Sequence, residues 1–591
     1  MGTEYLLFHA QFTVPTAIIL TLLYYPFLTH RDTYKFTFIT IVAVLYTIPW
    51  DSYLIRTGIW SYPPSTVMGY KAFEIPFEEI FFFIIQTYTT SLVYCICTKP
   101  LLWPIYLRAA SSKRQARDIG TASLVAVWAA GATCILSSSH ATYLGLIIIW
   151  AVPVLILQWV ISHGVILAIP YRGILNAIWI PTIYLWIADS IAIRAGTWTL
   201  SSKTKVNLQL WPGLELEEAV FFAVTNALVV FGLVTCDVAF AIDQYDYLTS
   251  ETLSRNTLSL TSAFKAIARK RTTFNNAILD ELCEASKCLY LKSQSMYLGS
   301  ALFQGQLRID LIFLYSFCRV IDDLVDETEN KNQALLWIEQ CSELLDTRFH
   351  SQNFENSISE KYISCEANRR LIASIKQLPA RRLSKQPLLD LLRGFTMDLE
   401  FNHKQGSFPI RTEFDLDMYA TLVAGTVGEL TLNLIYHHYF QNKPIHPPGK
   451  LKQIIEAGRE MGRALQYVNI ARDIHRDAII GRVYIPTSWL ERAGITPSDV
   501  IHHPWDTRVY MMQAKLLDKA ECCYQTSRAA IDELPAEVRG PVNATIESYM
   551  EICRDLRRKK GNLQSGRTFR LALWRRLLVL MSYHHHVSHK A

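Results

Sequence analysis

The sequence predicts an all-α protein in two parts, a membrane domain of seven helices followed by a soluble domain that is helical throughout. Three observations carry this prediction. Of the 591 residues, 50% are hydrophobic and only 19% are charged, and the apolar residues concentrate in residues 1–240. A block of sequence within that part occurs twice. The remainder shows helical periodicity and carries two rows of polar oxygen ligands at helical spacing.

Seven apolar stretches of the first part are candidates for membrane spans, because about 20 apolar residues cross a bilayer. The stretches are residues 5–27, 34–50, 76–97, 121–136, 142–168, 173–193 and 217–240, of which the second and fourth are short. The loop of residues 99–117 is rich in Lys and Arg and is expected on the cytosolic side, which also places the C-terminal part in the cytosol. Arg194, Lys203 and Lys205 on the opposite side argue against this orientation.

The membrane part repeats itself. DSYLIRTGIW, starting at Asp51, matches DSIAIRAGTW, starting at Asp189. PFEEIFFF, starting at Pro76, matches ELEEAVFF, starting at Glu215, at almost the same spacing. Three helices therefore recur, with the helix of residues 121–136 between the copies, so both copies cross the membrane in the same direction. Two parallel three-helix repeats of this kind suggest two similar halves that enclose one site.

Two adjacent glutamates head the last helix of each repeat. They are Glu78, Glu79, Glu217 and Glu218. Acidic residues at membrane depth are costly and mark functional sites, whereas glutamates at a helix N-terminus also suit the helix dipole, which is a structural reason for them. Both explanations stay open here. The repeated pairs Asp51 with Arg56 and Asp189 with Arg194 have a structural alternative as ion pairs at the loop entrances.

Residues 241–275 are more polar and predict a linker between a membrane domain of residues 1–240 and a soluble domain of residues 276–591. The basic run in this linker predicts either a short helix on the membrane surface or a charge cluster that flanks the membrane.

The soluble part carries two acidic ridges. In QYVNIARDIHRDAIIGRVYIP, Asn469, Asp473 and Asp477 follow one another at intervals of four residues and share one helix face. In RVIDDLVDE, Asp322 and Asp326 do the same. Hard oxygen ligands in this pattern suit Mg²⁺ or Mn²⁺, which binds through carboxylates together with substrate phosphates. We expect two walls of one cavity; a solvated acidic helix face is the alternative for either ridge alone.

Such an arrangement predicts the ionisation of an allylic diphosphate, whose cation then needs a dry, apolar pocket. Gly425 and Gly428 in YATLVAGTVGE allow the close approach of either a neighbouring helix or an isoprenoid chain. No GxGxxG fingerprint is present, so we expect no nicotinamide or flavin cofactor. No basic stripe interleaved with aromatics is present, so we expect no nucleic acid.

With these motifs in this order, residues from about 280 to 580 resemble the squalene/phytoene synthase family of head-to-head prenyl transferases. SQSMYLGSALF is similar to the family's Ser-Phe-Tyr opening, with Met296 in place of Phe. The resemblance implies an isoprenoid-synthase fold in which both ridges hold the metal ions. It implies diphosphate contacts for Arg308, Arg319 and Arg472. It also implies proton handling by Tyr419, a place beside the cation path for Gln466, and substrate binding by Ser295 and Tyr297.

PFEE in the first repeat matches the Pro-x-Glu-Glu motif of the small subunits of bacterial heterodimeric lycopene cyclases; the second copy has Glu215 where Pro is expected. The order of the two parts resembles the fungal bifunctional lycopene cyclase/phytoene synthases. The resemblance implies condensation of two geranylgeranyl diphosphates to phytoene, and redox-neutral cyclisation of lycopene to γ- and β-carotene. Cyclisation needs an acid and a base in an apolar site, and Glu78 and Glu217 are the stronger of the four candidates. The resemblance further implies a lipid bilayer and a separate phytoene desaturase as partners.

Two alternatives remain. The synthase motifs do not distinguish C15 from C20 diphosphates, so a squalene-synthase-type enzyme with a multi-pass anchor fits them too. The membrane part also fits a transporter, whereas a retinal protein is disfavoured because residues 217–240 contain no lysine.

Overall fold

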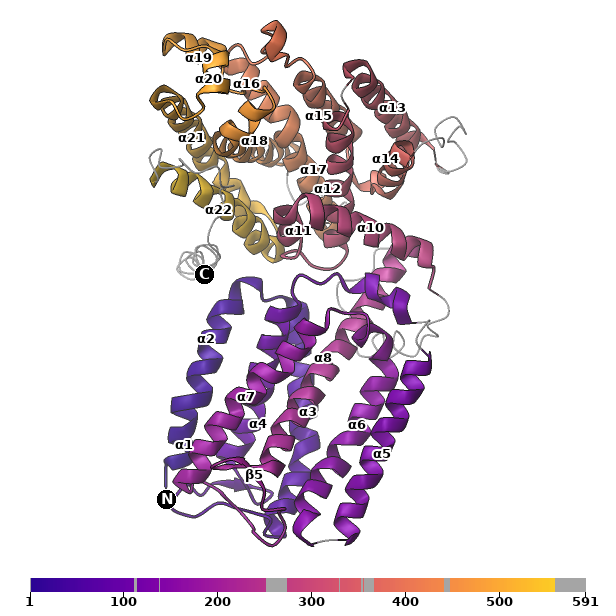
Figure 1. Cartoon of the computed structure of the whole chain (residues 1–591), viewed down its shortest axis with the longest axis vertical. Helices are drawn as coiled ribbons and strands as arrows, with labels where there is room; N and C mark the ends of the chain where they lie inside the picture. The colour runs from indigo at the N-terminus through magenta and orange to yellow at the C-terminus, as the bar shows by residue number, and fades with distance from the viewer. Residues whose placement is uncertain are drawn as a thin grey trace. The chain divides into compact units, whose positions relative to one another are not determined.

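Helices make up most of the computed structural model of the chain (Figure 1). The structure describes residues 2–110, 114–137, 139–250, 274–328, 330–351, 354, 366–440 and 447–558. The chain divides into two compact units, Met1–Asp280 and Glu281–Ala591. Of the predicted linker, residues 241–250 continue a helix of the first unit, and residues 251–273 lie outside the described residues.

The first unit is a bundle of long helices that run side by side (Figure 1). Its helices are α1 (Glu4–Phe8), η1 (His9–Thr13), α2 (Val14–Tyr24), η2 (Tyr25–Phe27), α3 (His30–Arg56), α4 (Phe77–Thr98), η3 (Trp103–Ala110), α5 (Arg114–Ser137), η4 (Ser139–Ala141), α6 (Thr142–Ile166), α7 (Tyr171–Ala195) and α8 (Leu216–Ser250). Its short strands are β1 (Trp60–Ser61), β2 (Lys71–Ala72), β3 (Ile75–Pro76), β4 (Thr199–Leu200), β5 (Gln209–Trp211) and β6 (Leu214–Glu215).

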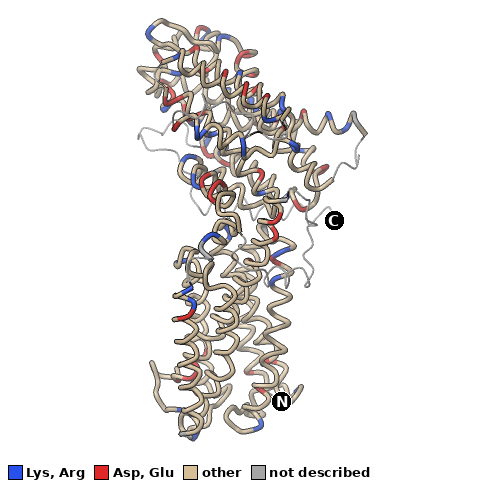
Figure 2. The backbone as a smooth tube through the Cα atoms, turned by 90° about the vertical axis from the view of Figure 1, so that its right-hand side faces the viewer, with Lys and Arg blue, Asp and Glu red and all other residues tan. Residues whose placement is uncertain are grey.

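Eight described helices are long and apolar enough to cross a membrane. Seven belong to the first unit, where charged residues are sparse along the middle of the helices (Figure 2). The eighth, Glu413–Phe440, lies in the second unit, and its residues Leu416, Leu430 and Leu434 are buried in the core of that unit. The length and apolar character of this eighth helix therefore reflect its place in the core of the second unit.

The helix α3 extends beyond the apolar stretch that predicts it. The prediction for α3 covers residues 34–50, but the helix begins at His30, where the Thr29 and Asp32 side chains cap each other's backbone N–H groups. Its charged first turns are buried because Lys35 pairs with Asp32 at 3.2 Å and with Asp237 of α8 at 3.0 Å. Paired charges lower the cost of burial, which is why a hydropathy pattern misses this part of α3.

The sequence repeat of the first unit recurs as repeated structure. Each copy has an antiparallel strand pair directly before its last helix, β2 with β3 before α4 and β5 with β6 before α8. The copies also meet directly, because β1 pairs with β4 and sets Ser61 opposite Thr199, its counterpart in the second copy. Antiparallel pairing of equivalent residues relates the two copies by a local two-fold axis at this point.

The second unit is helical throughout its described residues, as predicted. Its helices are α10 (Asn276–Lys292, which begins in the first unit), α11 (Gln294–Ser300), α12 (Gly305–Asp326), α13 (Lys331–His350), α14 (Glu366–Gln377), η8 (Ala380–Arg382), α15 (Lys385–Asp398), η9 (His403–Gln405), α16 (Glu413–Ala420), η10 (Thr421–Gly425), α17 (Thr426–Phe440), α18 (Pro448–Ile479), α19 (Thr487–Arg492), α20 (Pro497–His502), α21 (Thr507–Ser527), η11 (Arg528–Glu533) and α22 (Ala536–Arg558). One apolar core, from Leu307 of α12 to Leu556 of α22, joins them.

Glycines set the distance between α17 and α18 in this core. A Cβ atom on Gly428 would lie 2.5 Å from the carbonyl oxygen of Gly458, and one on Gly462 would lie still closer to that of Ala424. A neighbouring helix makes this close approach, and Gly428 also lines an apolar cavity described below.

We expect Gly428→Ala to destabilise the second unit by about 1–3 kcal/mol, because backbone atoms cannot move away from the added methyl group without separating the helices. Gly449, near the start of α18, is the matched control, since a Cβ atom there meets nothing within 4 Å, and Gly449→Ala should leave the packing of α17 against α18 unchanged. Hydrogen exchange of α17 and α18 in the detergent-solubilised full chain measures both effects. Equal protection in the two variants would contradict the expectation.

Candidate active sites

Each predicted acidic ridge of the second unit lies on one helix. In the second half of α12, the apolar residues are buried in the core and leave Arg319, Asp322 and Asp326 on a less buried face. On α18, Asn469, Asp473 and Asp477 are half-buried along one face. Four-residue spacing therefore places the ridge residues as the helix geometry requires.

Asp398, the last residue of α15, connects the two ridges. Burial and the neighbouring Asp326 raise the pKa of Asp322 to about 7, and Asp398 contributes to this rise. Burial and the neighbouring Asp473 raise the pKa of Asp477 to about 7, again with a contribution from Asp398. Because Asp398 acts on a carboxyl of each ridge, α12, α15 and α18 turn their acids toward one region.

Asp398 itself sits between two tyrosines. It accepts hydrogen bonds from Tyr419 at 3.1 Å and from Tyr484 at 2.7 Å, and the two rings stack with centroids 5.0 Å apart. Burial raises the pKa of Asp398 to about 6, against the opposing effect of Arg482. Tyr419, predicted to handle protons, is therefore hydrogen-bonded to a carboxyl that titrates near neutral pH.

Arginines on the ridges pair with neighbouring aspartates. Arg319 binds Asp322 at 2.9 Å and Asp323 at 2.8 Å, and Arg472 binds Asp473 at 2.9 and 2.5 Å. Both arginines are predicted diphosphate ligands, and both lie within the acidic region. A bound diphosphate would compete with these carboxylates for the guanidinium groups, since bidentate binding suits phosphate and carboxylate alike.

Arg482, near the C-terminal end of the second motif, contacts the acidic region between the ridges. It donates to Asp326 at 2.8 Å, and its charge lowers the pKa of Asp477 and of Asp398. One guanidinium group therefore lies near acids of α12, α15 and α18.

The acidic region fits a divalent cation in its chemistry. Among the described residues, no three His, Cys, Asp or Glu side chains already stand close enough to hold a metal ion. Two carboxyls with pKa values near 7 nevertheless indicate crowded negative charge that a cation would relieve. The Oδ1 atom of Asn469 is buried without a hydrogen-bond partner among the described residues, which leaves a hard oxygen donor for Mg²⁺ or Mn²⁺.

An apolar cavity of about 260 Å³ begins beside these ridges and runs between α17, α18, η11 and α22. Gln466 and Asn469 line it near the acidic region, and Leu534 and Ile546 line it further away. Gln466 accepts a weak hydrogen bond from Asn469 at 3.4 Å. Gln466 therefore lies at the polar end of an apolar cavity.

The remaining predicted substrate residues lie at the start of the unit. Arg308 is buried near the start of α12, and Tyr297 is buried in α11 with its ring edge-to-face against Tyr290 at 5.5 Å. Met296, which stands where the resemblance expects Phe, lines the apolar cavity. The side chain of Ser295 lies outside the described part of the structure.

We expect the second unit to lose stability as pH rises from 6 to 8 in the presence of a chelator. Asp322, Asp398 and Asp477 have folded pKa values of about 7, 6 and 7, above the unfolded value of about 3.9. The folded state therefore binds protons more tightly, and this stabilisation disappears as pH rises through the folded pKa values. Added Mg²⁺ should restore stability, more at pH 8 than at pH 5.5.

Hydrogen exchange of α12 and α18 in the detergent-solubilised full chain measures this effect with and without Mg²⁺. In Asp322→Asn, the pH dependence should become smaller. An equal effect of Mg²⁺ at pH 5.5 and pH 8 would contradict the expectation.

In the first unit, a narrow cavity lies where the two repeats meet. Six pairs of repeat-related residues line it, namely Asp51 and Asp189, Glu79 and Glu218, Tyr5 and Tyr143, Trp60 and Trp198, Phe82 and Phe221, and Phe83 and Phe222. Its described lining contains no Lys or Arg. Four carboxyl groups without a counter-cation in an apolar site cannot all carry charge at reasonable cost, so the cavity holds protons.

Tyrosines hold the cavity glutamates in place. Tyr5 and Tyr62 both donate to Oε2 of Glu79, the second at 2.8 Å. Tyr143, the counterpart of Tyr5, donates to Oε1 of Glu218 at 2.9 Å. The other oxygen of Glu218 is buried without a hydrogen-bond partner among the described residues, so it is free to exchange a proton with a molecule in the cavity.

Glu78 and Glu217, which rank first from the sequence, have different surroundings. Glu78 accepts from the backbone N–H of Met68 at 2.7 Å, and Glu217 accepts from that of Val206 at 2.6 Å. Neither lines the shared cavity. One oxygen of each is nevertheless buried without a partner among the described residues. Glu79 and Glu218 therefore line the shared cavity, whereas Glu78 and Glu217 hold the backbone of the loops that precede their helices.

The described residues do not form the ion pairs at the loop entrances that the sequence offers as an alternative. Asp189 accepts from the Trp198 indole at 3.1 Å, and Arg194 donates to the carbonyl of Pro212. No salt bridge joins Asp51 with Arg56 among the described residues.

Comparison with known proteins places both sites in known families. The family model described as squalene/phytoene synthase matches residues 290–575, and the one described as lycopene cyclase matches residues 4–97. A bifunctional lycopene cyclase/phytoene synthase of Arthroderma gypseum is 44% identical over 590 residues, which cover 98% of each chain. The enzymes of the same description from Aspergillus oryzae and Phaeosphaeria nodorum are 43% and 44% identical, again with 98% of each chain covered.

The chain belongs to the family of bifunctional lycopene cyclase/phytoene synthases.

The two family models divide this bifunctional cyclase/synthase as its sites do. The synthase match contains both acidic ridges and Asp398, and the cyclase match contains Asp51 and Glu79. The resemblance drawn from the motifs is thereby confirmed at the level of the family.

Sequence reasoning missed several residues of these sites in the bifunctional cyclase/synthase. Asp398, Tyr484 and Arg482 stand apart from any acidic row, so no spacing singles out Asp398. Tyr5 and Tyr143 carried a usable signal, since they recur at the same spacing as Asp51 and Asp189.

Proposed function

We propose that the chain catalyses two reactions, one in each unit. The second unit joins two geranylgeranyl diphosphates to phytoene and releases two diphosphates and two protons. The first unit closes rings on lycopene to give γ- and β-carotene without change of oxidation state. One observation carries this proposal: a single chain combines crowded acids beside an apolar cavity with a second, aromatic cavity rich in carboxyl groups.

In the synthase unit, the ridge residues would hold the metal ions. These residues are Asp322, Asp326, Asn469, Asp473 and Asp477. Bound Mg²⁺ or Mn²⁺ supplies positive charge that neutralises the departing diphosphate. Arg319 and Arg472 bind the diphosphate oxygens once their aspartates have other partners, because guanidinium groups match phosphate bidentately. Arg308 contributes a further positive charge from the start of α12.

The same unit shelters the resulting allylic cations from water. The cavity between α17, α18 and α22 takes the hydrocarbon chains, and Gln466 lies at its polar end. Ser295 and Tyr297 bind substrate from α11. Tyr419 receives a proton while it passes its own phenolic proton to the Asp398 carboxylate, whose negative charge before this transfer also stabilises cationic carbon nearby.

In the cyclase unit, a carboxylic acid of the shared cavity adds a proton to the terminal double bond of lycopene. The ring closes on the cation, and a carboxylate of the same cavity removes a proton to leave a β-ionone ring. Glu79 and Glu218 are the proposed carriers, and Trp60, Trp198 and the cavity tyrosines stabilise the cation with their ring faces. No atom is gained or lost, so the step needs no redox cofactor.

We further propose that α1–α2 and α3 to α8 form seven membrane spans, built as two parallel three-helix repeats with α5 between them. The basic loop of residues 99–117 is then cytosolic, and so is the synthase unit. A lipid bilayer holds the cyclase and its hydrophobic substrate. Because phytoene must lose hydrogen to become lycopene, a separate desaturase connects the two reactions.

Expression in cells that supply geranylgeranyl diphosphate and a phytoene desaturase tests the proposal. Cyclic carotenoids would support both activities in one chain. Lycopene without cyclic products would overturn the cyclase part. A C30 hydrocarbon in place of phytoene would overturn the assignment of C20 substrates and favour a squalene-synthase-type enzyme.

A further inference from the structure

The two repeats of the first unit make the same hydrogen bond in unlike surroundings. Tyr184 donates to the carbonyl of Phe12 at 2.8 Å, and its counterpart Tyr46 donates to the carbonyl of Trp150 at 2.7 Å. The acceptors Phe12 and Trp150 are counterparts as well, so the helices themselves are placed equivalently. What differs is the space beside each bond.

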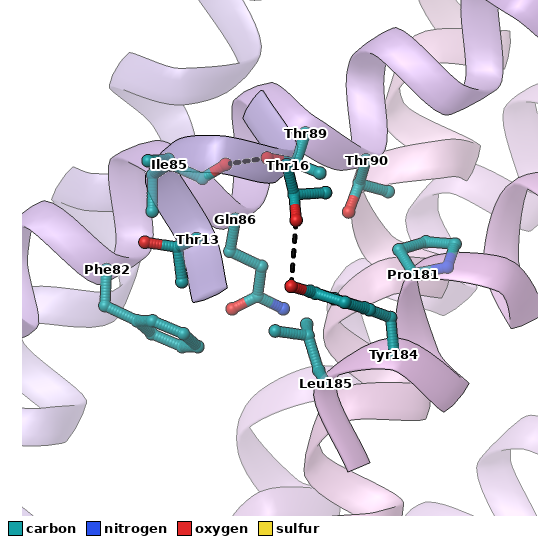
Figure 3. A pocket seen from close by; sticks show the side chains of 10 residues that line it. All are labelled: Thr13, Thr16, Phe82, Ile85, Gln86, Thr89, Thr90, Pro181, Tyr184 and Leu185. Atoms are coloured by element: carbon teal, nitrogen blue, oxygen red, sulfur yellow. Dashed lines mark hydrogen bonds between the residues drawn. The ribbon is translucent and has the colours of Figure 1, made fainter. Parts of the chain in front are cut away.

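On the Tyr184 side there is an open pocket between α2, α4 and α7 (Figure 3). Threonine is the most frequent residue of its wall. The Thr16 hydroxyl lies 2.8 Å from both the carbonyl of Phe12 and the Tyr184 hydroxyl, and Thr89 donates to the carbonyl of Ile85 at 2.7 Å (Figure 3). Because these hydroxyls already have hydrogen-bond partners, the threonines leave mainly methyl groups for the pocket. The pocket therefore suits a hydrocarbon although its residues are polar.

The pocket and the acid cavity adjoin at Phe82, which lines both. Phe82 stands one helical turn beyond Glu79 on α4, and the pocket then follows this helix to Thr90. From Glu79 to Thr90 the distance along the axis is about 16 Å at about 1.5 Å per residue. The opening is thus a slot that leads along α4 to a carboxyl group.

On the Tyr46 side, the equivalent space is filled. Trp150 stands where the first repeat has Phe12, and Trp50 stands where the second repeat has Ala188. The two indoles stack at 4.6 Å, and both lie against Phe221, the counterpart of Phe82, at 5.7 and 6.2 Å. Large aromatic rings packed in this way occupy the space on this side.

We propose that the slot of α2, α4 and α7 binds the linear polyene chain of the carotenoid, and that the Trp50–Trp150 stack closes its counterpart. This inference rests on the proposed cyclase function. The polyene then reaches the acid cavity from the Glu79 side only, one end at a time. A second ring requires the half-cyclised carotenoid to withdraw, turn and enter again by the same slot.

Filling the slot tests the inference. Thr89→Trp places an indole in it, and we expect cyclic carotenoids to fall by about tenfold or more while lycopene accumulates. Leu228→Trp is the matched control, because Leu228 is the half-buried counterpart of Thr89 on the closed side. It should keep the wild-type ratio of cyclic carotenoids to lycopene within about twofold. Phytoene formation by the same chain reports that each variant is produced.

A second pair of variants guards against misfolding at one position. Thr16→Trp fills the slot from α2, and Val154→Trp is its counterpart on α6. Normal cyclisation in both Thr89→Trp and Thr16→Trp would overturn the inference, as would equal losses in the variants of both sides. If the slot inference is overturned in one of these ways while Glu79→Gln abolishes cyclisation, the proposed function still stands. If neither Glu79→Gln nor Glu218→Gln affects cyclisation, the proposed function fails first.

Discussion

Asp398→Asn is expected to lower phytoene formation by about a hundredfold or more, with cyclisation of supplied lycopene unchanged. The substitution removes a negative charge that acts on carboxyls of both α12 and α18. It also breaks the arrangement of Tyr419 and Tyr484, because an amide NH₂ cannot accept the O–H that one of them donates. Metal binding and the position of Tyr419 are therefore disturbed together.

Asp390→Asn is the matched control for this experiment, since Asp390 lies two turns earlier on α15 and pairs with Arg393 away from the ridges. Product formation from geranylgeranyl diphosphate in membranes of the two variants gives the comparison. A steeper requirement for Mg²⁺ in Asp398→Asn would show that Asp398 acts through the metal ligands. More than half of the wild-type activity would contradict a role for Asp398.

Glu79→Gln and Glu218→Gln are each expected to reduce cyclisation by about a hundredfold or more and to leave phytoene synthesis intact. A glutamine amide can still accept a hydrogen bond from Tyr62 or Tyr143, so the cavity keeps its shape. It cannot carry a proton between the solvent and a polyene. Cells with a desaturase should then accumulate lycopene in place of cyclic products.

Glu78→Gln and Glu217→Gln separate this expectation from the ranking that the sequence favours. A glutamine at either position still accepts from the backbone N–H of Met68 or Val206, so we expect a loss of less than about tenfold. The ratio of lycopene to cyclic carotenoids in the four variants is the measurement. If Glu78→Gln and Glu217→Gln lose more activity than the other two, the assignment to the shared cavity is wrong.

Sequence patterns predict those features of this chain that repeat with a short period. The ridges of α12 and α18 follow from four-residue spacing, and the apolar stretches predict the long helices of the first unit. The start of α3 cannot be predicted in this way, because it depends on the pairing of Lys35 with Asp237, which is far away in the sequence. Asp398 is missed for the same physical reason, since only tertiary packing brings it between the ridges.

Glu78 and Glu79 show a second limit of sequence reasoning. Adjacent residues of a helix point about 100° apart, so only the rotation of α4 decides which one faces a cavity. Packing of α4 against α3, α7 and the strands sets that rotation, and no local pattern encodes it. The tyrosine that approaches each cavity glutamate from another helix would have resolved the choice.

The low burial of α5 bears on whether the two copies of the repeat can be made as separate polypeptides. Only 6% of its apolar window is buried, and the contacts between the repeats, such as Ser61 with Thr199 and Tyr5 with Trp198, do not involve it. In the chain, α5 lies between the first copy and the second. Genes that encode the two halves separately should accordingly yield polypeptides that find each other and rebuild the shared cavity.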